Sequence, residues 1–297
     1  MTDLNFARSF LFVPGDRPER FAKAAQSGAH AMIMDLEDAV ADAAKAEARR
    51  NIRAYLDESH PQNILVRINN AENRGFAADL DVAQHEGLAG VILPKANHAQ
   101  VADLARHLSR PVWPLIETAQ GVSEAAAIAG LPNCGRMLLG TIDLSQEMGL
   151  DMEHPGGQAM LDHARYQLVS AACRAGRPAP IDGVFPSLED AQGLKAAAKH
   201  AAAIGMSGMM CIHPRQIEAI HAAFFPTDTE IEWAGAVLAA SQTEKSSFRF
   251  RGQMVDKPVL ARATTILSRL PDDGGDPRPE ADLHVKLRLD QTKGRKR

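Results

Sequence analysis

Cysteine, aromatic residues and long apolar runs are all scarce in this chain of 297 residues. The three cysteines are widely spaced and form no CxxC pair, which argues against a disulfide framework or a thiolate zinc site. Aromatic residues make up only 5% of the chain while alanine is abundant, which favours close-packed helices over a sandwich of aromatic-rich strands. No apolar run approaches the ~20 residues that span a bilayer, and the N-terminus lacks a basic start followed by an apolar signal core. We therefore expect a cytoplasmic protein with no membrane partner.

A strong charge of either sign is also missing. The formal net charge is −4, and the sequence contains neither a basic stripe nor an aromatic platform, so we expect no nucleic-acid partner. Apolar residues (45%) and charged residues (24%) occur in the proportions of an ordinary soluble globular protein. A chain of this length can bury a full core within one α/β domain.

Short apolar runs alternate with longer helical patterns along most of the chain. The runs predict strands at Ser9–Val13, Ala31–Met34, Ile64–Ile68, Gly90–Leu93, Val112–Ile116, Met137–Gly140, Ile181–Phe185 and Met209–Ile212. Strands that alternate with helices indicate βαβ units and a parallel sheet. Eight strands in about 215 residues is the number that closes a (β/α)8 TIM barrel, an α/β fold. The alternative is an open doubly wound sheet, but no GxGxxG turn follows the first strand.

The alternation stops after Phe225-Pro226, and this change predicts three parts. Residues 1–225 would form the barrel, and residues 226–270 a C-terminal helical lid extension. Within that lid we expect helices at Thr227–Ser241 and Val259–Leu270, joined by a turn-rich segment. Residues 271–297 are rich in Asp, Gly, Pro and basic residues, which predicts a disordered polar tail.

Glu117 and Asp143 each follow a short apolar run that is typical of a buried strand. Two carboxylates at the ends of neighbouring parallel strands can hold one hard divalent cation and leave its other positions to water and substrate. Without clustered histidines, such a site suits Mg²⁺, or Mn²⁺, better than zinc. Gly140 would let a ligand approach the backbone beside Asp143, so we place Gly140 and Thr141 in the expected substrate-binding set. The alternative is that both carboxylates are capping or ion-pair groups at strand ends.

Further polar side chains follow other strands. Arg67 ends an apolar run and is suited to clamping a carboxylate, although an arginine there could also simply extend into solvent. Asp35, Glu37 and Asp38 carry too much charge for a core, so they form either a solvated loop or partners for Arg17 or Arg67. We expect them to support the site by such pairing. Arg17 lies in a strand-to-helix turn, where a free helix N-terminus would attract an anion such as phosphate.

Lys95 and His213 lie at the same predicted rim. For His213, we expect a structural role as a cap of the following helix, which is commoner than a catalytic one. Barrel enzymes build their sites at the carboxyl ends of the strands. The gathering of charged residues there predicts a metal site for an anionic, oxygen-rich substrate.

These stretches resemble the citrate lyase β-subunit family, which includes malyl-CoA and citramalyl-CoA lyases. The matching motifs are, in chain order, RSFLFVPGDRPER (Arg8–Arg20), DLEDAV (Asp35–Val40), VRIN (Val66–Asn69), GVILPK (Gly90–Lys95), LIETAQGV (Leu115–Val122), GTIDLSQEMG (Gly140–Gly149), IDGV (Ile181–Val184) and IHPRQ (Ile212–Gln216). The motifs cover the whole predicted barrel in consistent order, which makes the resemblance far more specific than any single motif.

The resemblance implies a barrel that assembles as a homotrimer or homohexamer, with Mg²⁺ held by Glu117 and Asp143. It implies that Arg67 binds substrate oxygen and stabilises developing enolate charge. The motif GQMVDKP (Gly252–Pro258) is similar to the lid of the malyl-CoA lyase branch, in which the aspartate matching Asp256 reaches a neighbouring subunit's site. Asp256 is therefore the expected proton donor to the enolate. As a departure from the family, Met209 stands where a lysine is usual, so the sequence leaves open whether the family's rim electrostatics are fully kept.

The expected function is that of a Mg²⁺-dependent carbon–carbon lyase. It would cleave a 3-hydroxy-3-carboxyacyl-CoA, of citramalyl-CoA or malyl-CoA type, to acetyl-CoA and a 2-oxo acid. One alternative is an acyl-carrier lyase like the citrate lyase β-subunit, or an aldolase acting on a non-CoA 2-oxo acid. Another is a non-catalytic subunit that binds acyl thioesters.

Overall fold

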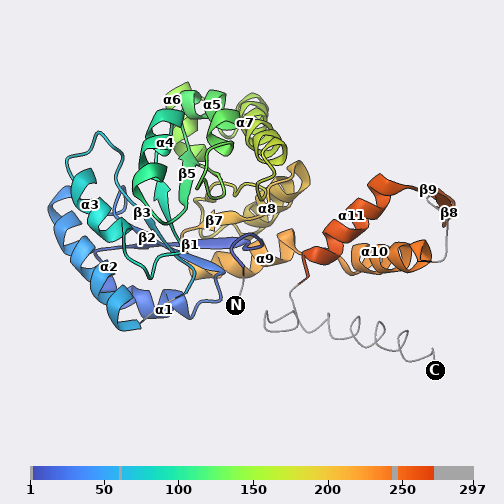
Figure 1. Ribbon diagram of the computed structural model, residues 1–297, viewed down its shortest axis with the longest axis horizontal. Coiled ribbons are helices and arrows are strands. Elements are labelled where there is room, and N and C mark those ends of the chain that lie inside the picture. Colours follow the sequence, from blue (N-terminus) through green and yellow to red (C-terminus); the bar gives the residue numbers. More distant parts are fainter. Residues whose placement is uncertain (1–2, 60–61, 243–246, 271–297) are drawn as a thin grey trace. The chain divides into compact units, whose positions relative to one another are not determined.

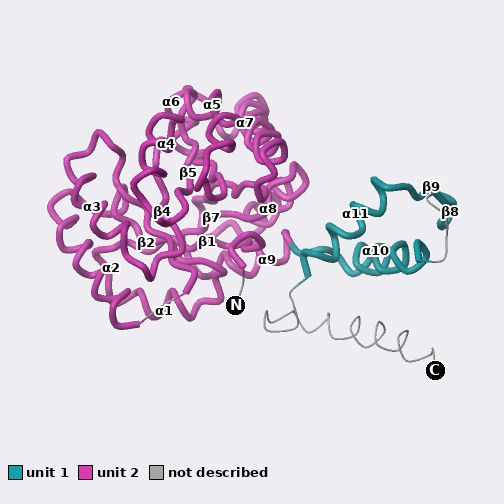
Figure 2. The backbone as a smooth tube through the Cα atoms, in the orientation of Figure 1, with its two compact units in different colours: residues 1, 225–297 teal, residues 2–224 magenta. Residues whose placement is uncertain are grey.

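A computed structural model describes residues 3–59, 62–242 and 247–270 of the chain (Figure 1). These residues fall into two compact units, which are divided between Phe224 and Phe225 (Figure 2). The tail over residues 271–297, for which we predicted disorder, lies outside the described residues. No helix in the described ranges is both long and apolar enough to cross a membrane.

The first unit is built on a seven-stranded parallel sheet with the order β6-β5-β4-β3-β2-β1-β7. Its strands are β1 (Ser9–Pro14), β2 (Ala31–Asp35), β3 (Ile64–Arg67), β4 (Gly90–Leu93), β5 (Val112–Ile116), β6 (Leu138–Leu139) and β7 (Met209–Cys211). All seven come from the apolar runs that predicted strands. Their residues are almost entirely buried, as expected for a parallel sheet that helices cover.

Helices follow the strands and pack around the curled sheet (Figure 1). They are α1 (Phe21–Ala25), α2 (Lys45–Ser59), α3 (Phe76–Ala83), α4 (His98–His107), α5 (Ala119–Ala129), α6 (Thr141–Met148), α7 (Pro155–Arg174), α8 (Ala191–Ile204) and α9 (Ile217–Phe224), and short 3₁₀ turns precede α1, α2 and α9. The helical spacing of the sequence predicts helices at Pro18–Ser27, Ala39–Leu56, Phe76–His85, Ala99–Leu108, Ser123–Ala129, Gln158–Ala175 and Leu188–Ile204. Two of the observed helices, α6 and α9, are absent from this set. Both are only eight residues long, which leaves little room for a periodic pattern.

The seventh predicted strand is present only as two backbone bridges. Ile181 pairs with Leu138 of β6, and Asp182 pairs with Met209 of β7. These bridges join the two edges of the seven-stranded sheet. The curled parallel sheet with its covering helices is therefore consistent with the predicted (β/α)8 barrel.

The prediction of a regular strand over Ile181–Phe185 is wrong beyond its first two residues. Pro180 and Pro186 flank the segment, and neither can donate an N–H to a ladder. Between them, Gly183 lies so close to Thr141 that an added Cβ would be 2.4 Å from the Thr141 hydroxyl oxygen. A ladder of hydrogen bonds therefore cannot continue along this segment.

Successive strand side chains point into two different cores, as the alternation of a β-strand requires. The inner core contains Phe10, Ile33, Leu65, Ile92, Trp113, Leu115, Leu138, Ile181 and Met210. The outer core contains the neighbouring strand residues Leu11, Met34, Val66, Val91, Ile116, Leu139 and Met209 together with apolar helix residues. Met209 is thus buried among the helices at the start of β7, next to Ser9 at the start of β1. This position, where the resembling family usually has a lysine, lies at the amino-terminal ends of the strands, opposite the ends that carry Arg67 and Glu117.

Arg136 is enclosed at the amino-terminal end of the strands. Its guanidinium donates to the carbonyl oxygens of Leu4 (2.7 Å), Ala7 (2.8 Å) and Ala179 (3.0 Å), and to the Ser207 hydroxyl (2.6 Å). The side chain is only 2% exposed, so these contacts replace its hydration almost completely. Arg136 thereby ties the N-terminal segment to the loops that precede the last two strand positions.

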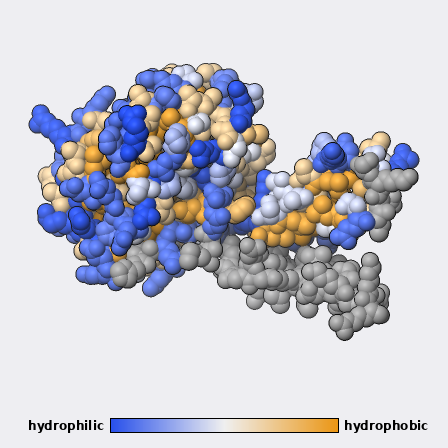
Figure 3. Space-filling view, viewed as in Figure 1, coloured by the Kyte–Doolittle hydropathy of each residue, from blue (hydrophilic) through white to orange (hydrophobic). Residues whose placement is uncertain are grey.

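The second unit contains α10 (Asp228–Ser241), β8 (Phe248–Phe250), β9 (Gln253–Val255) and α11 (Lys257–Ser268). The segment that we expected to be turn-rich is instead an antiparallel hairpin, β8–β9. The unit's small core consists of Ala234, Val237, Val255, Ala263 and Ile266. Apolar side chains also gather on its surface over α10 and α11 on the face in view (Figure 3). A capping box at Thr227 and Glu230 begins α10, which shows that local sequence signals place this helix.

Candidate active site

Strands β2, β3 and β5 carry the central residues of the candidate site, and β4 lies between β3 and β5 in the sheet. Asp35 ends β2 and lies beside Arg67, the last residue of β3, while Glu117 directly follows β5. Because the strands are parallel, their carboxyl ends meet at one rim. All three side chains are buried, with Glu117 only 3% exposed. Buried charges need partners, and the contacts among these residues supply them.

Arg67 is held by acidic residues that come from the end of β2 and the loop after it. Its Nε and Nη2 donate to the two oxygens of Asp35 at 2.7 and 2.6 Å, and its Nη1 lies 2.9 Å from Glu37 Oε2. Asp38 is a more distant and exposed neighbour at 3.7 Å. The predicted pairing of these acids with Arg67 is confirmed. Since Asp35 occupies one edge of the guanidinium, only the remaining Nη hydrogens are left for a substrate oxygen.

Glu117 is fixed on both sides. Its Oε1 accepts a hydrogen bond of 2.8 Å from the backbone N–H of Lys95. Its Oε2 packs against Gly140, where an added Cβ would lie 2.4 Å from this oxygen. Any side chain at position 140 would therefore displace the Glu117 carboxylate. Gly140 matters through this close approach to Glu117, a contact that the sequence did not reveal.

Two carboxyl groups at the rim, those of Glu117 and Glu37, are buried with too little nearby positive charge to stabilise their ionised forms fully. Burial, together with the charges of Glu37 and Asp143, raises the pKa of Glu117 from 4.5 to about 8. Burial also raises the pKa of Glu37 to about 7; the charge of Arg67 opposes this shift, whereas Asp38 and Asp35 add to it. The N–H of Lys95 and the charge of Arg67 do not cancel the cost of ionising Glu117. A cation at this rim would remove that cost.

Asp143 reaches the site from a helix, and not from a strand end as the sequence pattern suggested. It lies in the first turn of α6, after β6 has ended at Leu139. Its charge raises the pKa of Glu117, so the two carboxyl groups lie within electrostatic reach of each other. A carboxylate in the first helical turn also gains from the partial positive charge of the helix N-terminus.

The donor set fits a hard divalent cation. No group of three or more His, Cys, Asp or Glu side chains in the described ranges is arranged to hold a metal. A site with two protein carboxylates, Glu117 and Asp143, would leave most coordination positions to water and substrate, which is how Mg²⁺ is usually bound. Burial and neighbouring negative charge raise the pKa of Glu117, and within the described ranges its one hydrogen bond is to Oε1, from the N–H of Lys95. Both observations fit a rim whose carboxylates act as ligands of Mg²⁺.

A buried polar network supports the loop that carries Glu37. We predicted no role for its members from the sequence. Lys45 Nζ donates to the side-chain oxygen of Asn69 and lies 3.4 Å from the Glu37 carbonyl oxygen. Asn69 donates from Nδ2 to Leu36 O (3.0 Å) and to Asp79 Oδ2 (2.6 Å). The network thus holds the backbone at positions 36 and 37 on both sides.

A sequence signal for this network was available. Lys45 shares the buried stripe of α2 with Ala48, Ile52 and Leu56, and a lysine in such a stripe needs a partner. Asp79 likewise lies on the buried face of α3 and is fully enclosed. When two neighbouring helices each have a charged residue at a position that otherwise faces the core, a buried polar network between the helices is expected.

Other predicted residues lie outside this cluster. Arg17 is largely exposed, and its nearest carboxylate is that of the adjacent Asp16, at 3.9 Å. His213 accepts a hydrogen bond from Arg215 N at 3.1 Å at the start of a 3₁₀ turn, so the predicted capping role is confirmed. Asp256 belongs to the second unit and caps α11 by accepting from Val259 N at 3.3 Å.

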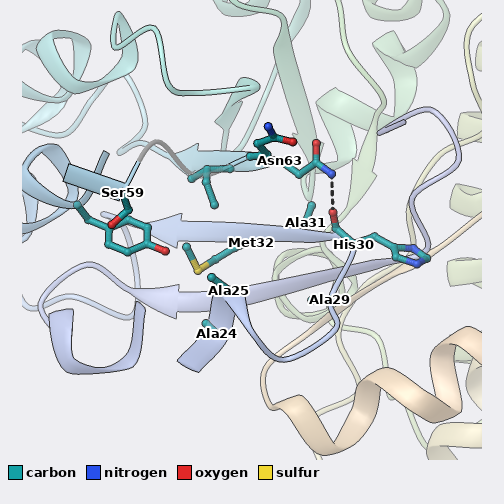
Figure 4. Close-up of a pocket in the computed structure, with 11 residues that line it drawn as sticks. Ala24, Ala25, Ala29, His30, Ala31, Met32, Ser59 and Asn63 are labelled. Carbon is teal, nitrogen blue, oxygen red and sulfur yellow. Dashed lines mark hydrogen bonds between the residues drawn. The ribbon is translucent and has the colours of Figure 1, made fainter. Parts of the chain in front are cut away.

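A pocket of about 390 Å³ opens at the other end of the strands, near the starts of β2 and β3 (Figure 4). Alanines and Met32 line it, and Asn63 at its edge donates to the His30 carbonyl oxygen at 3.1 Å. Its lining contains no Asp, Glu, Lys or Arg. It therefore offers none of the charged groups found at the rim.

Comparison with known proteins accounts for this arrangement. Residues 8–214 match the model of the HpcH/HpaI aldolase/citrate lyase family. The chain belongs to this family. A citrate lyase subunit beta-like protein of Mycobacterium tuberculosis is 42% identical over 265 residues, which cover 88% of this chain and 94% of that protein. A (3S)-malyl-CoA thioesterase of Cereibacter sphaeroides is 37% identical over 240 residues, covering 78% and 82% of the two chains.

Solved structures of family members contain bound ligands. The crystal structure of CitE from M. tuberculosis in complex with magnesium, acetoacetate and coenzyme A has a TM-score of 0.77 and 40% sequence identity, covering 90% of this chain and 99% of that one. A second CitE structure, with magnesium and pyruvate, has a TM-score of 0.71 and 36% identity, covering 89% and 100%. The resemblance that we inferred from the motifs is therefore confirmed at the level of the family, and homologues of this chain are magnesium-bound.

Proposed function

We propose that this protein is a Mg²⁺-dependent carbon–carbon lyase that cleaves a 3-hydroxy-3-carboxyacyl-CoA to acetyl-CoA and a 2-oxo acid. Citramalyl-CoA and malyl-CoA are the two substrates that we favour. The observation that carries the proposal is the buried Glu117 carboxylate, which is positioned beside Asp143 and has no cation of its own within the described residues. The magnesium, pyruvate, acetoacetate and coenzyme A of the CitE structures support the same ligand chemistry.

The residues of the rim suit the cleavage step. A bound Mg²⁺ would polarise the carboxylate and hydroxyl oxygens of the substrate and later the carbonyl of the 2-oxo acid. Glu117 and Asp143 would hold that ion. Arg67, oriented by Asp35, would direct its remaining N–H groups at the thioester oxygen, where negative charge develops as the bond breaks. Gly140 and Thr141 would line the substrate at the start of α6.

Asp256 is our candidate for protonating the resulting enolate, from a lid formed by the second unit. We further propose that the lid serves a neighbouring subunit, in a homotrimer or homohexamer. A mass measurement in solution, by light scattering after gel filtration, tests that assembly, and a monomer would exclude it.

An assay of product release tests the reaction itself. Wild-type protein would be incubated with citramalyl-CoA or malyl-CoA, with Mg²⁺ or with EDTA, while 2-oxo acid, acetyl-CoA and free thiol are measured. We expect Mg²⁺-dependent pyruvate or glyoxylate together with an equal amount of acetyl-CoA. Folded protein that releases neither product from both thioesters would exclude this substrate class and favour a carrier-bound or non-CoA acid, or a non-catalytic subunit.

Thioester hydrolysis is a second candidate function. It is favoured by the malyl-CoA thioesterase relative and by Glu37, a buried carboxyl whose pKa of about 7 suits a group that accepts a proton from water. Hydrolysis of malyl-CoA would consume one water and release malate and the free thiol of CoA, without any 2-oxo acid. The same assay separates the two reactions, because lyase activity produces acetyl-CoA and no free thiol.

Two substitutions separate the catalytic and structural roles of Asp256. Asparagine is as good a helix cap as aspartate but cannot transfer the proton, whereas alanine removes both properties. We expect Asp256→Asn and Asp256→Ala to bind Mg²⁺ normally and to lose turnover alike. If Asp256→Asn turns over normally while Asp256→Ala does not, the residue acts only as a cap for α11.

A further inference from the structure

Lys95 has an unusual backbone conformation next to the candidate metal site. It follows Pro94 in the turn after β4, and its φ angle is +48°, in the left-handed region. The described residues include only three other non-glycine positions with positive φ, and two of these are asparagines, which tolerate that region well. Glycine or asparagine is the usual choice at such a turn position, so a lysine there carries a conformational cost.

The strained backbone has a specific contact. The Lys95 N–H donates to Glu117 Oε1 at 2.8 Å, and the next residue, Ala96, donates to Leu115 O at 3.1 Å. The turn is therefore fastened to β5 at two points, on either side of the last strand residue. With Oε1 held by this N–H, the Glu117 carboxylate presents Oε2 toward Gly140 and the start of α6.

The side chain of Lys95 indicates a second role for this residue. Lys95 is exposed, and no ion pair or side-chain hydrogen bond holds its ammonium group within the described part of the chain. Its positive charge nevertheless lowers the pKa of Glu37, so the ammonium group lies within electrostatic reach of that buried carboxyl group. Since glycine or asparagine would satisfy the turn with less strain, the turn conformation alone does not call for a lysine at this position.

We propose that Lys95 has two separable functions at this site: its backbone N–H positions Glu117 for the cation, and its ammonium group attracts an anionic acyl thioester. The first function requires a residue that adopts the left-handed conformation. The second requires a positive charge. The proposal rests on the proposed metal site, and it adds a residue whose backbone and side chain act on different ligands.

Four substitutions separate these functions. Lys95→Gly and Lys95→Asn keep the left-handed turn but remove the charge, and Lys95→Arg keeps the charge. Lys95→Val removes the charge and disfavours the turn, because a β-branched residue is strained at positive φ. The Kd for Mg²⁺, measured by calorimetry without substrate, reports the backbone function. The KM for the acyl-CoA, measured at two salt concentrations, reports the charge.

We expect Lys95→Gly, Lys95→Asn and Lys95→Arg to bind Mg²⁺ within about twofold of wild type, and Lys95→Val to bind it about tenfold more weakly, as for loss of an outer-shell partner. We expect the glycine and asparagine variants to raise KM by about fivefold, the upper range for an exposed ion pair, and to lose the salt dependence of KM. Lys95→Arg would retain the wild-type KM.

Equal weakening of Mg²⁺ binding by glycine and by valine would overturn the backbone function. An unchanged, salt-dependent KM in Lys95→Gly would overturn the function of the charge. Should Lys95→Val not fold, Lys95→Ala, which is also strained at positive φ, takes its place with a smaller expected loss of Mg²⁺ affinity. If wild-type protein binds Mg²⁺ yet cleaves no thioester, the proposed reaction fails, while the metal titrations still decide the backbone function.

Discussion

Two buried arginines lie at opposite ends of the same strands, and they are satisfied in different ways. Arg67, at the carboxyl ends, is paired with carboxylates and lies 4.8 Å from the ring of Phe12. Arg136, at the amino ends, lies 5.4 Å from the ring of Phe10 and is bonded to backbone carbonyls and a hydroxyl. Phe10 and Phe12 are alternate residues of β1, so one strand presents an aromatic ring to each arginine.

The difference separates a site suited to chemistry from one suited to stability. Burial lowers the pKa of Arg136, whereas at Arg67 the effect of burial is outweighed by Asp35 and Glu37, which raise the pKa. Carboxylates can exchange partners with a substrate or a cation, while backbone carbonyls are fixed by the fold. Arg67 should therefore control activity, and Arg136 should control unfolding.

Replacement of Arg67 should have the largest effect. Arg67→Met leaves Asp35 and Glu37 buried without their cation, and removing one partner of a buried ion pair costs about 3–5 kcal/mol. We expect kcat to fall by about 100-fold or more in Arg67→Lys, which keeps the charge but not the forked geometry. Thermal unfolding and steady-state kinetics measure the two effects. A lysine variant with wild-type kcat would show that the fork is not needed.

Replacement of Arg136 should affect stability alone. Arg136→Met retains the apolar stem but removes all four hydrogen bonds of the guanidinium and leaves the buried Ala7 carbonyl without this donor, so we expect a loss of about 3 kcal/mol. That corresponds to a Tm about 10 °C lower for a unit of this size. Arg177→Met is the matched control, since Arg177 also bonds backbone carbonyls but is only half-buried. The Mg²⁺ affinity of folded Arg136→Met should equal that of wild type, and a weakened affinity would contradict the division of roles.

The stability of the folded protein should depend on pH because of the buried carboxyl groups at the rim. Glu37 and Glu117 have folded pKa values of about 7 and 8, above the ordinary 4.5, so the folded state binds more protons than the unfolded state between these limits. Stability of the metal-free protein should therefore fall as pH rises from about 5 to 8. We expect Glu117→Gln, or added Mg²⁺, to flatten this decline in Tm. A metal-free wild type whose Tm does not fall over this range would contradict the raised values.

The smallest effect is expected from the buried network behind Glu37. Asp79→Asn weakens the acceptor of two Asn69 hydrogen bonds and of an Arg49 contact at 2.8 Å. We expect a loss of about 1–2 kcal/mol in stability and a modest decrease of kcat, because the backbone at Leu36 and Glu37 is less firmly held. Asp103→Asn, which removes an exposed pair with Arg106, is the control and should change neither quantity. If Asp79→Asn lowers stability but leaves kcat unchanged, the network does not position Glu37.

Much of the strand framework could be predicted from the sequence, because each buried parallel strand is a short apolar run. The segment after Pro180 could not, since its apolar run does not show that Gly183 packs closely against Thr141, and the prolines at both ends of the run lack an N–H. Helix α6 was missed for a related reason: the apolar run before it continued smoothly into Thr141 and Ile142. A run of hydrophobic residues does not show where a strand ends.

For the candidate site, the charged residues and the pairing of the acids with Arg67 could be predicted, but other contacts could not. Charged residues after apolar runs identified Arg67, Glu117 and the acids after β2. The close approach of Gly140 to Glu117 and the left-handed backbone at Lys95 depend on how neighbouring turns meet in space. Such features follow from tertiary packing, so local patterns carry no signal for them.

The closing of the sheet has a consequence for synthesis of the chain. In the seven-stranded sheet the first strand, β1, pairs with the last, β7, as Ser9 pairs with Met209. The partner of β1 is therefore synthesised some two hundred residues after β1 itself. Until then a growing chain presents two unpaired strand edges, which are sites for wrong association. Before β7 is made, only the bridge at Ile181 can add to the sheet, next to β6, because the bridge at Asp182 needs Met209 of β7. The nascent protein is therefore most vulnerable just before its final strand emerges from the ribosome.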